Sequence, residues 1–159
     1  MPSVATIGVY GFTLSAFIDS LHRGHVRLLL DVRQRRGVRG SEYAWANSKR
    51  LQAAVAEAGI AYRHHPELAP TTELRQLQYA EDARQGVGKR SRAELAPEYV
   101  ERYTREILDH ANLDVFVDAL PHEPSALLCV ERDPEACHRS LVAERLAAEH
   151  GVSVTHLRP

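Results

Sequence analysis

The sequence contains few residues that could cross-link it or hold a metal ion. Cys129 and Cys137 are the two cysteines among 159 residues, and they lie eight positions apart. A reducing compartment would keep both as thiols, so we expect no structural disulfide. The nine histidines show no tight ligand spacing, and the chain has no Cys-x-x-Cys pair. We therefore expect neither a metal site nor a cofactor.

Long apolar runs are also missing. The apolar stretch from Val26 to Leu30 is broken by Arg27, whereas a membrane-spanning helix needs about 20 mostly apolar residues. The N-terminus lacks the basic and then apolar pattern of a secretion signal. With 44% hydrophobic and 26% charged residues, the composition is that of a globular protein. We predict one α/β domain over residues 1–159, a cytoplasmic location and no membrane partner.

Charge is distributed unevenly along the chain. The net charge is −1, but residues 22–50 hold eight Lys or Arg residues against Asp31 and Glu42, so this segment is +6. The rest of the chain then carries −7. Such a segment is typical of a protein that binds an anionic ligand, and equally of a solvated basic loop.

The order of strand-like and helix-like segments predicts the fold class. Short β-branched or continuously apolar segments indicate strands at 3–9, 26–32, 60–64, 125–131 and 152–157. Helical spacing of apolar residues begins near Thr13, at Asn47 or Ser48, and after Asp133. This order favours three layers, with a mostly parallel sheet of about five strands and helices on both faces. Ligands of such sheets bind beyond the carboxyl ends of the strands.

The middle of the chain is less regular. A helix is predicted from Thr71 or Thr72 to about Ala83, and two more are predicted over 96–110 and 113–120. Between them, residues 85–92 (QGVGKRSR) have the glycine and charge content of a mobile loop.

A predicted helix start at Asp133 and Pro134 gives the first chemical hypothesis. Asp caps free backbone N–H groups, and Pro fits the first helical position without losing a hydrogen bond. Cys137 would then lie at the end of the first turn of a helix over 134–149. There the helix dipole, together with His138 and Arg139, would stabilise a thiolate or a bound oxyanion. The alternative is that Cys137 is a small core residue.

Other polar residues follow neighbouring strands of the predicted sheet. Glu131 could act as a general base or orient an arginine, with Arg33 as the expected partner. A purely architectural ion pair is the alternative. Arg33, Arg36 and Arg39 lie in one loop, and guanidinium groups can bind phosphate or carboxylate through two parallel hydrogen bonds. Cys129 lies inside the apolar strand and is expected to be a core residue.

Several known designs do not fit the spacing. A Cys-based phosphatase loop needs an arginine six positions after its cysteine, but Ala143 follows Cys137 at that distance and Glu135 follows Cys129. A rhodanese-like sulfurtransferase has its cysteine at the opening of a loop, whereas Cys137 is predicted inside a helix start. The chain has neither a Walker loop nor a GxGxxG motif, which disfavours an ATPase or a dinucleotide enzyme.

Four blocks of residues carry a resemblance to a known family. They are 6–8 (TIG) with Phe17 and Leu21, 31–39 (DVRQRRGVR), 59–62 (GIAY), and 127–131 (LLCVE) with 137–139 (CHR). Through these blocks the chain resembles the bacterial domain-of-unknown-function family 488 over nearly its whole length. The resemblance implies a compact α/β fold with the motif residues gathered at one end of the sheet, and no established reaction. The chain departs from the family's loop at Arg36, where proline is usual, and at Val38, where serine is usual.

Three hypotheses about function follow, and the oligomeric state is left open. In the first, the chain binds a phosphorylated or other anionic ligand, nucleotide-like in kind, and acts on it; whether it is an enzyme is undecided. The ligand-binding candidates are Arg33, Arg39, Arg139 and Tyr62, and the catalytic candidates are Cys137, His138 and Glu131. In the second, the chain is a non-catalytic module associated with nucleic acid, with Tyr43 and Trp45 as its exposed aromatic candidates. In the third, the polar residues form a buried network that only fixes the fold.

Overall fold

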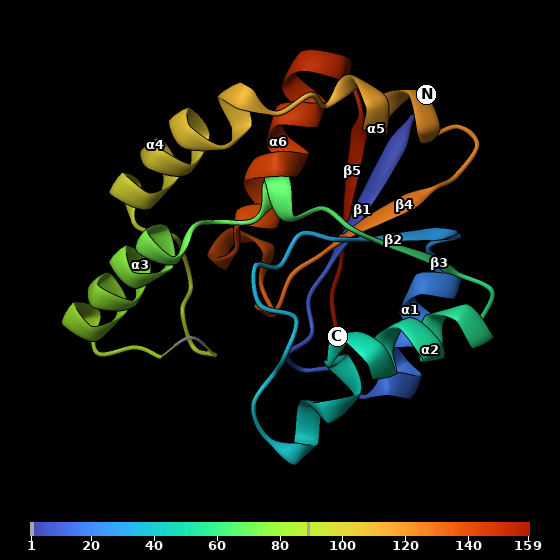
Figure 1. The fold of residues 1–159 in the computed structure, drawn as a ribbon, viewed down its shortest axis with the longest axis horizontal. Helices are drawn as coiled ribbons and strands as arrows, with labels where there is room; N and C mark the ends of the chain where they lie inside the picture. The colour runs from blue at the N-terminus through green and yellow to red at the C-terminus, as the bar shows by residue number, and fades with distance from the viewer. Residues whose placement is uncertain (1, 89) are drawn as a thin grey trace.

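The computed structural model describes residues 2–88 and 90–159 (Figure 1). The strands are β1 (Ser3–Ile7), β2 (Leu28–Asp31), β3 (Ala61–His64), β4 (Ser125–Leu128) and β5 (Ser153–Leu157). The α-helices are α1 (Leu14–Arg23), α2 (Ser48–Glu57), α3 (Thr72–Gln85), α4 (Pro97–Glu106), α5 (Asp114–Ala119) and α6 (His138–His150). Short 3-10 helices are η1 (Ser41–Ala46), η2 (Pro66–Leu68), η3 (Leu108–His110) and η4 (Pro134–Ala136). None of the helices in these two ranges is long and apolar enough to cross a membrane.

The strands form one parallel sheet in the order β3-β2-β4-β1-β5. In the middle of the sheet, Leu128 of β4 pairs with Ile7 of β1 on one side and with Asp31 of β2 on the other. The carboxyl ends of three strands therefore meet at one edge. The segments that leave this edge, 8–13, 32–40 and 129–137, begin beside one another. This confirms the predicted α/β sheet.

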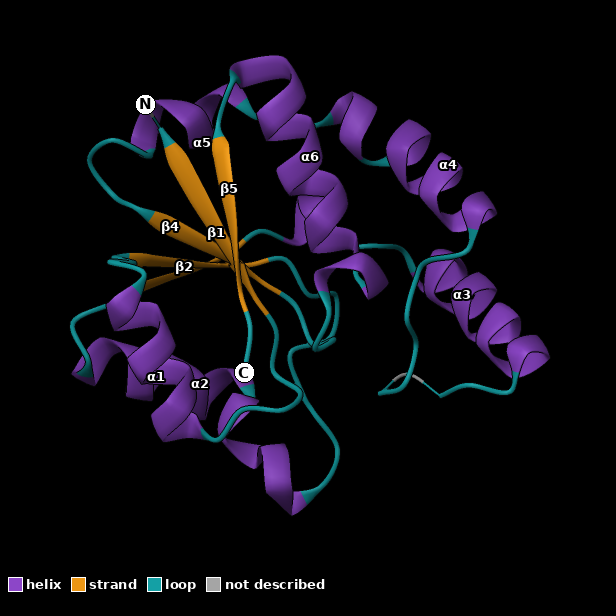
Figure 2. Cartoon of the chain, turned by 180° about the vertical axis from the view of Figure 1, so that it is seen from behind, coloured by secondary structure: helices purple, strands orange, loops and turns teal. Residues whose placement is uncertain are grey.

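Two apolar layers cover the sheet, one on each face. Successive strand residues point to opposite faces, so that Leu29 packs with Phe17 of α1 and Leu51 of α2. Leu30, its neighbour, belongs to the layer that contains Val142 of α6. Figure 2 shows α1 and α2 on one side of the strands and α5 and α6 on the other. The predicted three-layer arrangement is thus confirmed.

Helices α3 and α4 lie outside this sandwich, beyond α6 as seen from the sheet (Figures 1 and 2). α4 packs on α6, and α3 packs on α4. The hydroxyl of Tyr103 in α4 is buried and donates to the carbonyl oxygen of Leu68 at 2.6 Å, which ties α4 to the segment after β3. α3 ends at Gly86, whose positive φ of 72° suits glycine. The described residues between 86 and 96 form no helix or strand; the mobility of residues 85–92 stays a prediction.

Two of the predicted element boundaries near Cys137 were wrong. The strand expected over 125–131 ends at Leu128, because the backbone N–H groups of Val9 and Tyr10 both donate to the carbonyl of Val130 and end the regular ladder. The helix expected over 134–149 is divided into η4 and α6. Between them Cys137 is extended, with φ −139° and ψ 147°, and it is the residue before α6. Cys137 therefore does not lie inside a helical turn.

Candidate functional site

A cavity of about 400 Å³ lies at the carboxyl edge of the sheet. Part of its lining comes from the loop after β2, within residues 33–39, and part comes from α3 and the loop that follows it. The segments 129–131 and 136–138, which leave β4 and lead into α6, also line it. The cavity therefore occupies the place that the parallel sheet predicts for a ligand.

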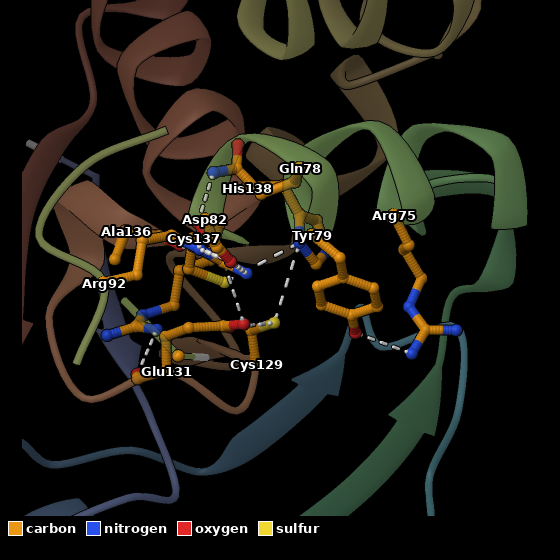
Figure 3. Close-up of polar contacts among 12 residues, drawn as sticks. Arg75, Gln78, Tyr79, Asp82, Arg92, Cys129, Glu131, Ala136, Cys137 and His138 are labelled. Carbon is orange, nitrogen blue, oxygen red and sulfur yellow. Dashed lines mark hydrogen bonds and ion pairs between the residues drawn. The ribbon is translucent and has the colours of Figure 1, made fainter. Parts of the chain in front are cut away.

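Cys129, Cys137 and His138 form a compact cluster on the cavity floor (Figure 3). Sγ of Cys129 and Sγ of Cys137 each lie 3.6 Å from Nδ1 of His138. Sγ of Cys129 also lies 3.4 Å from Oε2 of Glu131. The sequence analysis expected Cys129 to be a core residue; it is buried, but its sulfur belongs to this cluster.

The backbone fixes the orientation of the His138 ring. Nε2 of His138 lies 2.7 Å from the carbonyl oxygen of Val32, the residue after β2. A carbonyl oxygen can only accept, so Nε2 carries a hydrogen atom and donates it. Nδ1 is thus the ring nitrogen that faces the two sulfur atoms.

The environment distinguishes the two thiols. Burial disfavours a charged sulfur, but the hydrogen bond from Cys129 and the nearby His138 outweigh burial and hold the pKa of the Cys137 thiol well below its ordinary value. Burial and the neighbouring Cys137 raise the pKa of the Cys129 thiol well above its ordinary value. The pKa of His138 is raised above its ordinary value. Burial alone would lower this pKa, but the negative charge of Cys137 has the larger effect. A Cys137 thiolate beside a His138 imidazolium is the favoured charge pattern.

Arg92 connects α3 to the cavity floor. It donates to both carboxylate oxygens of Asp82 at 2.7–3.0 Å, to Oε1 of Glu131 at 3.3 Å and to the carbonyl oxygen of Ala136 at 3.0 Å (Figure 3). Gln78 donates to Asp82 and accepts from the backbone N–H of Ala96. This network was not predicted from the sequence. The available sequence signal was the pair Gln78 and Asp82. These two polar residues are four positions apart in a predicted helix and so share one of its faces.

Arg33 lies on the cavity wall but is paired elsewhere than predicted. Its Nε and Nη2 donate to the two carboxylate oxygens of Asp31 at 2.9 and 2.8 Å, and Nη1 donates to the carbonyl oxygen of Ala46. The expected partner Glu131 pairs instead with Arg92. Asp31 is two residues away from Arg33 and equally buried, so it neutralises the guanidinium locally. The pKa of Arg33 is raised above its ordinary value. Burial alone would lower this pKa, but the hydrogen bonds and negative charge of Asp31 have the larger effect.

Arg139 is placed outside the cavity lining. Its side chain is fully buried and donates to the carbonyl oxygens of Glu131 at 2.7 Å and Arg132 at 3.2 Å. Gly8 of the segment after β1 passes so close to the same Glu131 carbonyl that a Cβ atom there would overlap it. These contacts hold the backbone of residues 131–132 in place; a role of Arg139 in ligand binding stays a prediction.

Tyr62 is also placed outside the cavity lining. Its hydroxyl donates to Oδ2 of Asp31 and accepts a long hydrogen bond of 3.4 Å from Arg36. Tyr62 therefore supports the carboxylate that pairs with Arg33.

Three other arginines line the cavity without a carboxylate partner. Arg35, Arg39 and Arg75 form no ion pair with any carboxylate in the part of the chain that the structure describes. Arg75 of α3 instead donates to Oε1 of Gln34 and to the hydroxyl of Tyr79, both at 2.9 Å. Within residues 2–88 and 90–159, these three guanidinium groups therefore have no carboxylate that neutralises them.

The expected aromatic candidates for stacking on nucleic acid lie in the core. Tyr43 is 6% exposed and Trp45 is 8% exposed, so the expectation that they are exposed was wrong. Both belong to η1 and to the apolar layer of α1 and α2; the Trp45 ring lies 5.0 Å from the Phe17 ring, and the Tyr43 ring lies 5.1 Å from the Tyr10 ring. Rings covered in this way cannot serve as a platform for bases.

Comparisons with known proteins match the chain to one family. The model of the domain of unknown function DUF488 matches residues 13–146. No curated protein and no solved structure matches the chain. The match includes the loop after β2, α3, and the segment that carries both cysteines and His138.

Proposed function

Because the chain belongs to the DUF488 family, whose description assigns no activity, we propose a function from the cavity itself. The protein binds a phosphorylated or otherwise anionic small molecule of nucleotide-like size. The groups on the cavity floor act on this ligand.

The observation that carries this proposal is the set of unneutralised arginines on the cavity wall. Arg35 and Arg39 come from the loop after β2 and Arg75 comes from α3, and all three line one cavity. A guanidinium group presents donors in a fixed fork that matches two oxygens of a phosphate or carboxylate. An anionic ligand would provide the negative charge that these three side chains lack.

The size and the aromatic lining suggest the rest of the ligand. A volume of about 400 Å³ lies within the range of about 300–1,000 Å³ that is usual for small-molecule sites. The Tyr79 ring lines the cavity and is 36% exposed, and the guanidinium carbon of Arg75 lies 5.5 Å from its centre. An aromatic ring beside phosphate-binding groups suits a base and its phosphates.

The proposed reactive groups are those on the floor: Cys137, His138 and Glu131. All three line the same cavity as the arginines. Of the other predicted residues, Arg33 and Arg39 line the cavity. We assign Arg39 to ligand contact, and we assign Arg33 with its partner Asp31 to shaping the wall.

Calorimetric titration of the whole chain at low ionic strength tests the proposal. The probes are pyrophosphate, AMP and ADP, with adenosine as the neutral control and a single-stranded oligonucleotide as a probe for the nucleic-acid hypothesis. We expect the phosphate compounds to bind and adenosine to bind more weakly. Phosphorus NMR of each bound compound over time would show whether the floor groups convert it.

Arginine variants locate the binding. Replacing Arg39 or Arg75 by Ala should weaken pyrophosphate binding by about tenfold or more, because a hydrogen bond to a charged group contributes about 1.5–3 kcal/mol. Arg84→Ala is the matched control, since Arg84 also lies on α3 but is largely exposed and pairs with Glu81. Absence of binding by all phosphate compounds, or equal losses in the Arg84 variant, would overturn the proposal. Preferential binding of the oligonucleotide would favour the nucleic-acid hypothesis.

A further inference from the structure

The donor atoms on the cavity floor have the composition of a zinc site. Sγ of Cys129, Sγ of Cys137 and Nδ1 of His138 lie within 4.8 Å of one another, and all three side chains are buried. Thiolate sulfur and imidazole nitrogen are donors that Zn²⁺ prefers in proteins. We propose that Cys129, Cys137 and His138 bind Zn²⁺ and leave a fourth coordination position open toward the cavity.

The distances match tetrahedral coordination. With Zn–S bonds of about 2.3 Å and a Zn–N bond of about 2.0–2.1 Å, a tetrahedral angle places sulfur and nitrogen about 3.6 Å apart. Both sulfur atoms lie 3.6 Å from Nδ1 of His138. The same geometry requires about 3.8 Å between the two sulfur atoms. In the structure they lie at most 4.8 Å apart, so they would have to move only slightly closer to each other.

Without a metal ion, hydrogen bonds link this cluster: the thiol of Cys129 lies 3.4 Å from Oε2 of Glu131, and Sγ of Cys137 lies 3.6 Å from Nδ1 of His138. Nδ1 of His138 has either one lone pair or one hydrogen atom, so it can form a well-directed hydrogen bond with one sulfur atom. Cys129 and Cys137 approach it at the same distance. A cation between the three atoms would satisfy all of them at once.

The surroundings of His138 are those of a metal ligand. Histidine ligands usually donate their second ring N–H to a carbonyl or carboxylate, which fixes the ring and the tautomer. Nε2 of His138 makes this contact with the carbonyl oxygen of Val32 at 2.7 Å. The ring is therefore held with Nδ1 directed at the sulfur atoms.

The charges around the cluster are compatible with an ion of charge +2. Two thiolates from Cys129 and Cys137 would neutralise it. Glu131 lies 3.4 Å from Sγ of Cys129, but its other carboxylate oxygen contacts Arg92, so we do not assign it as the fourth ligand. With three protein donors, the fourth position is available for water or for an oxygen of a bound ligand, as in catalytic zinc sites.

The zinc site extends the proposed function without depending on it. When Zn²⁺ is bound, Cys137 is a metal ligand, and the ion would polarise an oxygen of the anionic ligand. Without Zn²⁺, the anion would still meet Arg35, Arg39 and Arg75. Metal binding and pyrophosphate binding can therefore be measured separately.

Cobalt spectroscopy of the whole chain tests the inference. The protein is reduced, treated with a chelator, separated from it and titrated with Co²⁺ in a buffer free of phosphate. We expect a sulfur-to-cobalt charge-transfer band and the intense visible absorption of tetrahedral Co²⁺, both saturating at one ion per chain. Because the chain has no third cysteine, the charge-transfer band reports on Cys129 and Cys137. Zn²⁺ should displace Co²⁺ and protect both thiols from iodoacetamide.

Variants identify the donors. His138→Asn and Cys129→Ser should lower Zn²⁺ affinity by more than about a hundredfold, which exceeds the usual loss for residues that only support a ligand. His110→Asn replaces an exposed histidine on η3 and should leave the affinity unchanged. A weak octahedral cobalt spectrum together with unprotected thiols in the unmodified protein would overturn the zinc site, whatever the variants do. That result would leave pyrophosphate binding intact, whereas loss of pyrophosphate binding alone would overturn the proposed function.

Discussion

Arg92 and Asp82 form an ion pair with two parallel hydrogen bonds, although they lie ten positions apart in the chain. Their side chains are 5% and 6% exposed. The third nitrogen of the same guanidinium donates to the carbonyl oxygen of Ala136, just before Cys137. One side chain thus joins α3, the loop after it and the cavity floor.

Breaking this pair should destabilise the protein. Arg92→Ala leaves the Asp82 carboxylate buried without its partner, which costs about 3–5 kcal/mol in comparable buried pairs. Urea unfolding should show this decrease in the free energy of unfolding. Arg84→Ala, which removes an exposed pair with Glu81, should change it by about 0.5 kcal/mol or less. Equal effects of the two substitutions would contradict the structural importance of Arg92.

Adding one methyl group at Gly8 should disturb the backbone beside the cavity floor. The Cβ atom of Gly8→Ala would overlap the carbonyl oxygen of Glu131, and backbone cannot move aside as easily as a flexible side chain. We expect a loss of about 1–3 kcal/mol or more in thermal or urea unfolding. Gly37→Ala is the control, since its nearest neighbour would be a side-chain atom at 3.8 Å. An unchanged stability of the Gly8 variant would show that the segment after β1 is free to shift.

The Tyr62 hydroxyl should contribute to stability and not to ligand binding. Tyr62→Phe removes the hydrogen bond to Asp31, which should cost about 1–3 kcal/mol because the acceptor is charged. Its affinity for pyrophosphate should equal that of the unmodified chain, because Tyr62 does not line the cavity. A tenfold weaker affinity in calorimetry would instead restore Tyr62 as a ligand-binding residue.

His156 should make the protein less stable in mild acid. Burial and the charges of Arg139 and Arg158 hold the pKa of His156 below its ordinary value of 6.5. The unfolded chain therefore binds a proton at His156 more readily than the native chain does, so stability is lost as the pH falls below about 6.5. His156→Gln should lose less stability than the unmodified protein between about pH 7 and pH 5. Identical pH profiles for the His156 variant and the unmodified protein would refute the assignment.

Much of the fold could be predicted because its signals are local. The apolar run around Leu29 indicates a strand covered on both faces, and both faces are indeed covered. Helices were predicted to begin near Thr13 and at Thr71 or Thr72, and the hydroxyls of Thr13 and Thr71 accept from the backbone N–H groups of Ala16 and Leu74. Such signals involve neighbours within a few residues, so a single sequence contains them.

The site was harder to predict because its contacts depend on small differences in where elements end. Cys129 looks like a core residue if the strand continues to residue 131, but β4 ends at Leu128 and the sulfur turns toward His138. Cys137 was predicted inside a helix because the sequence does not show that η4 and α6 are separate elements. Arg92 lies in a charged segment that resembles a solvated loop, and only the tertiary structure brings it to Asp82.

The separate position of α3 outside the sandwich has a consequence for how the protein can diversify. The floor residues belong to short segments fixed by the sheet and by α6, while one wall of the cavity is supplied by α3 and the loop after it. Substitutions at Arg75 or Tyr79 can change the shape and charge of that wall without altering the sulfur and imidazole atoms below. Under the proposed function, chains with this architecture could therefore change which anionic ligand they bind while keeping the same cysteine and histidine residues on the floor.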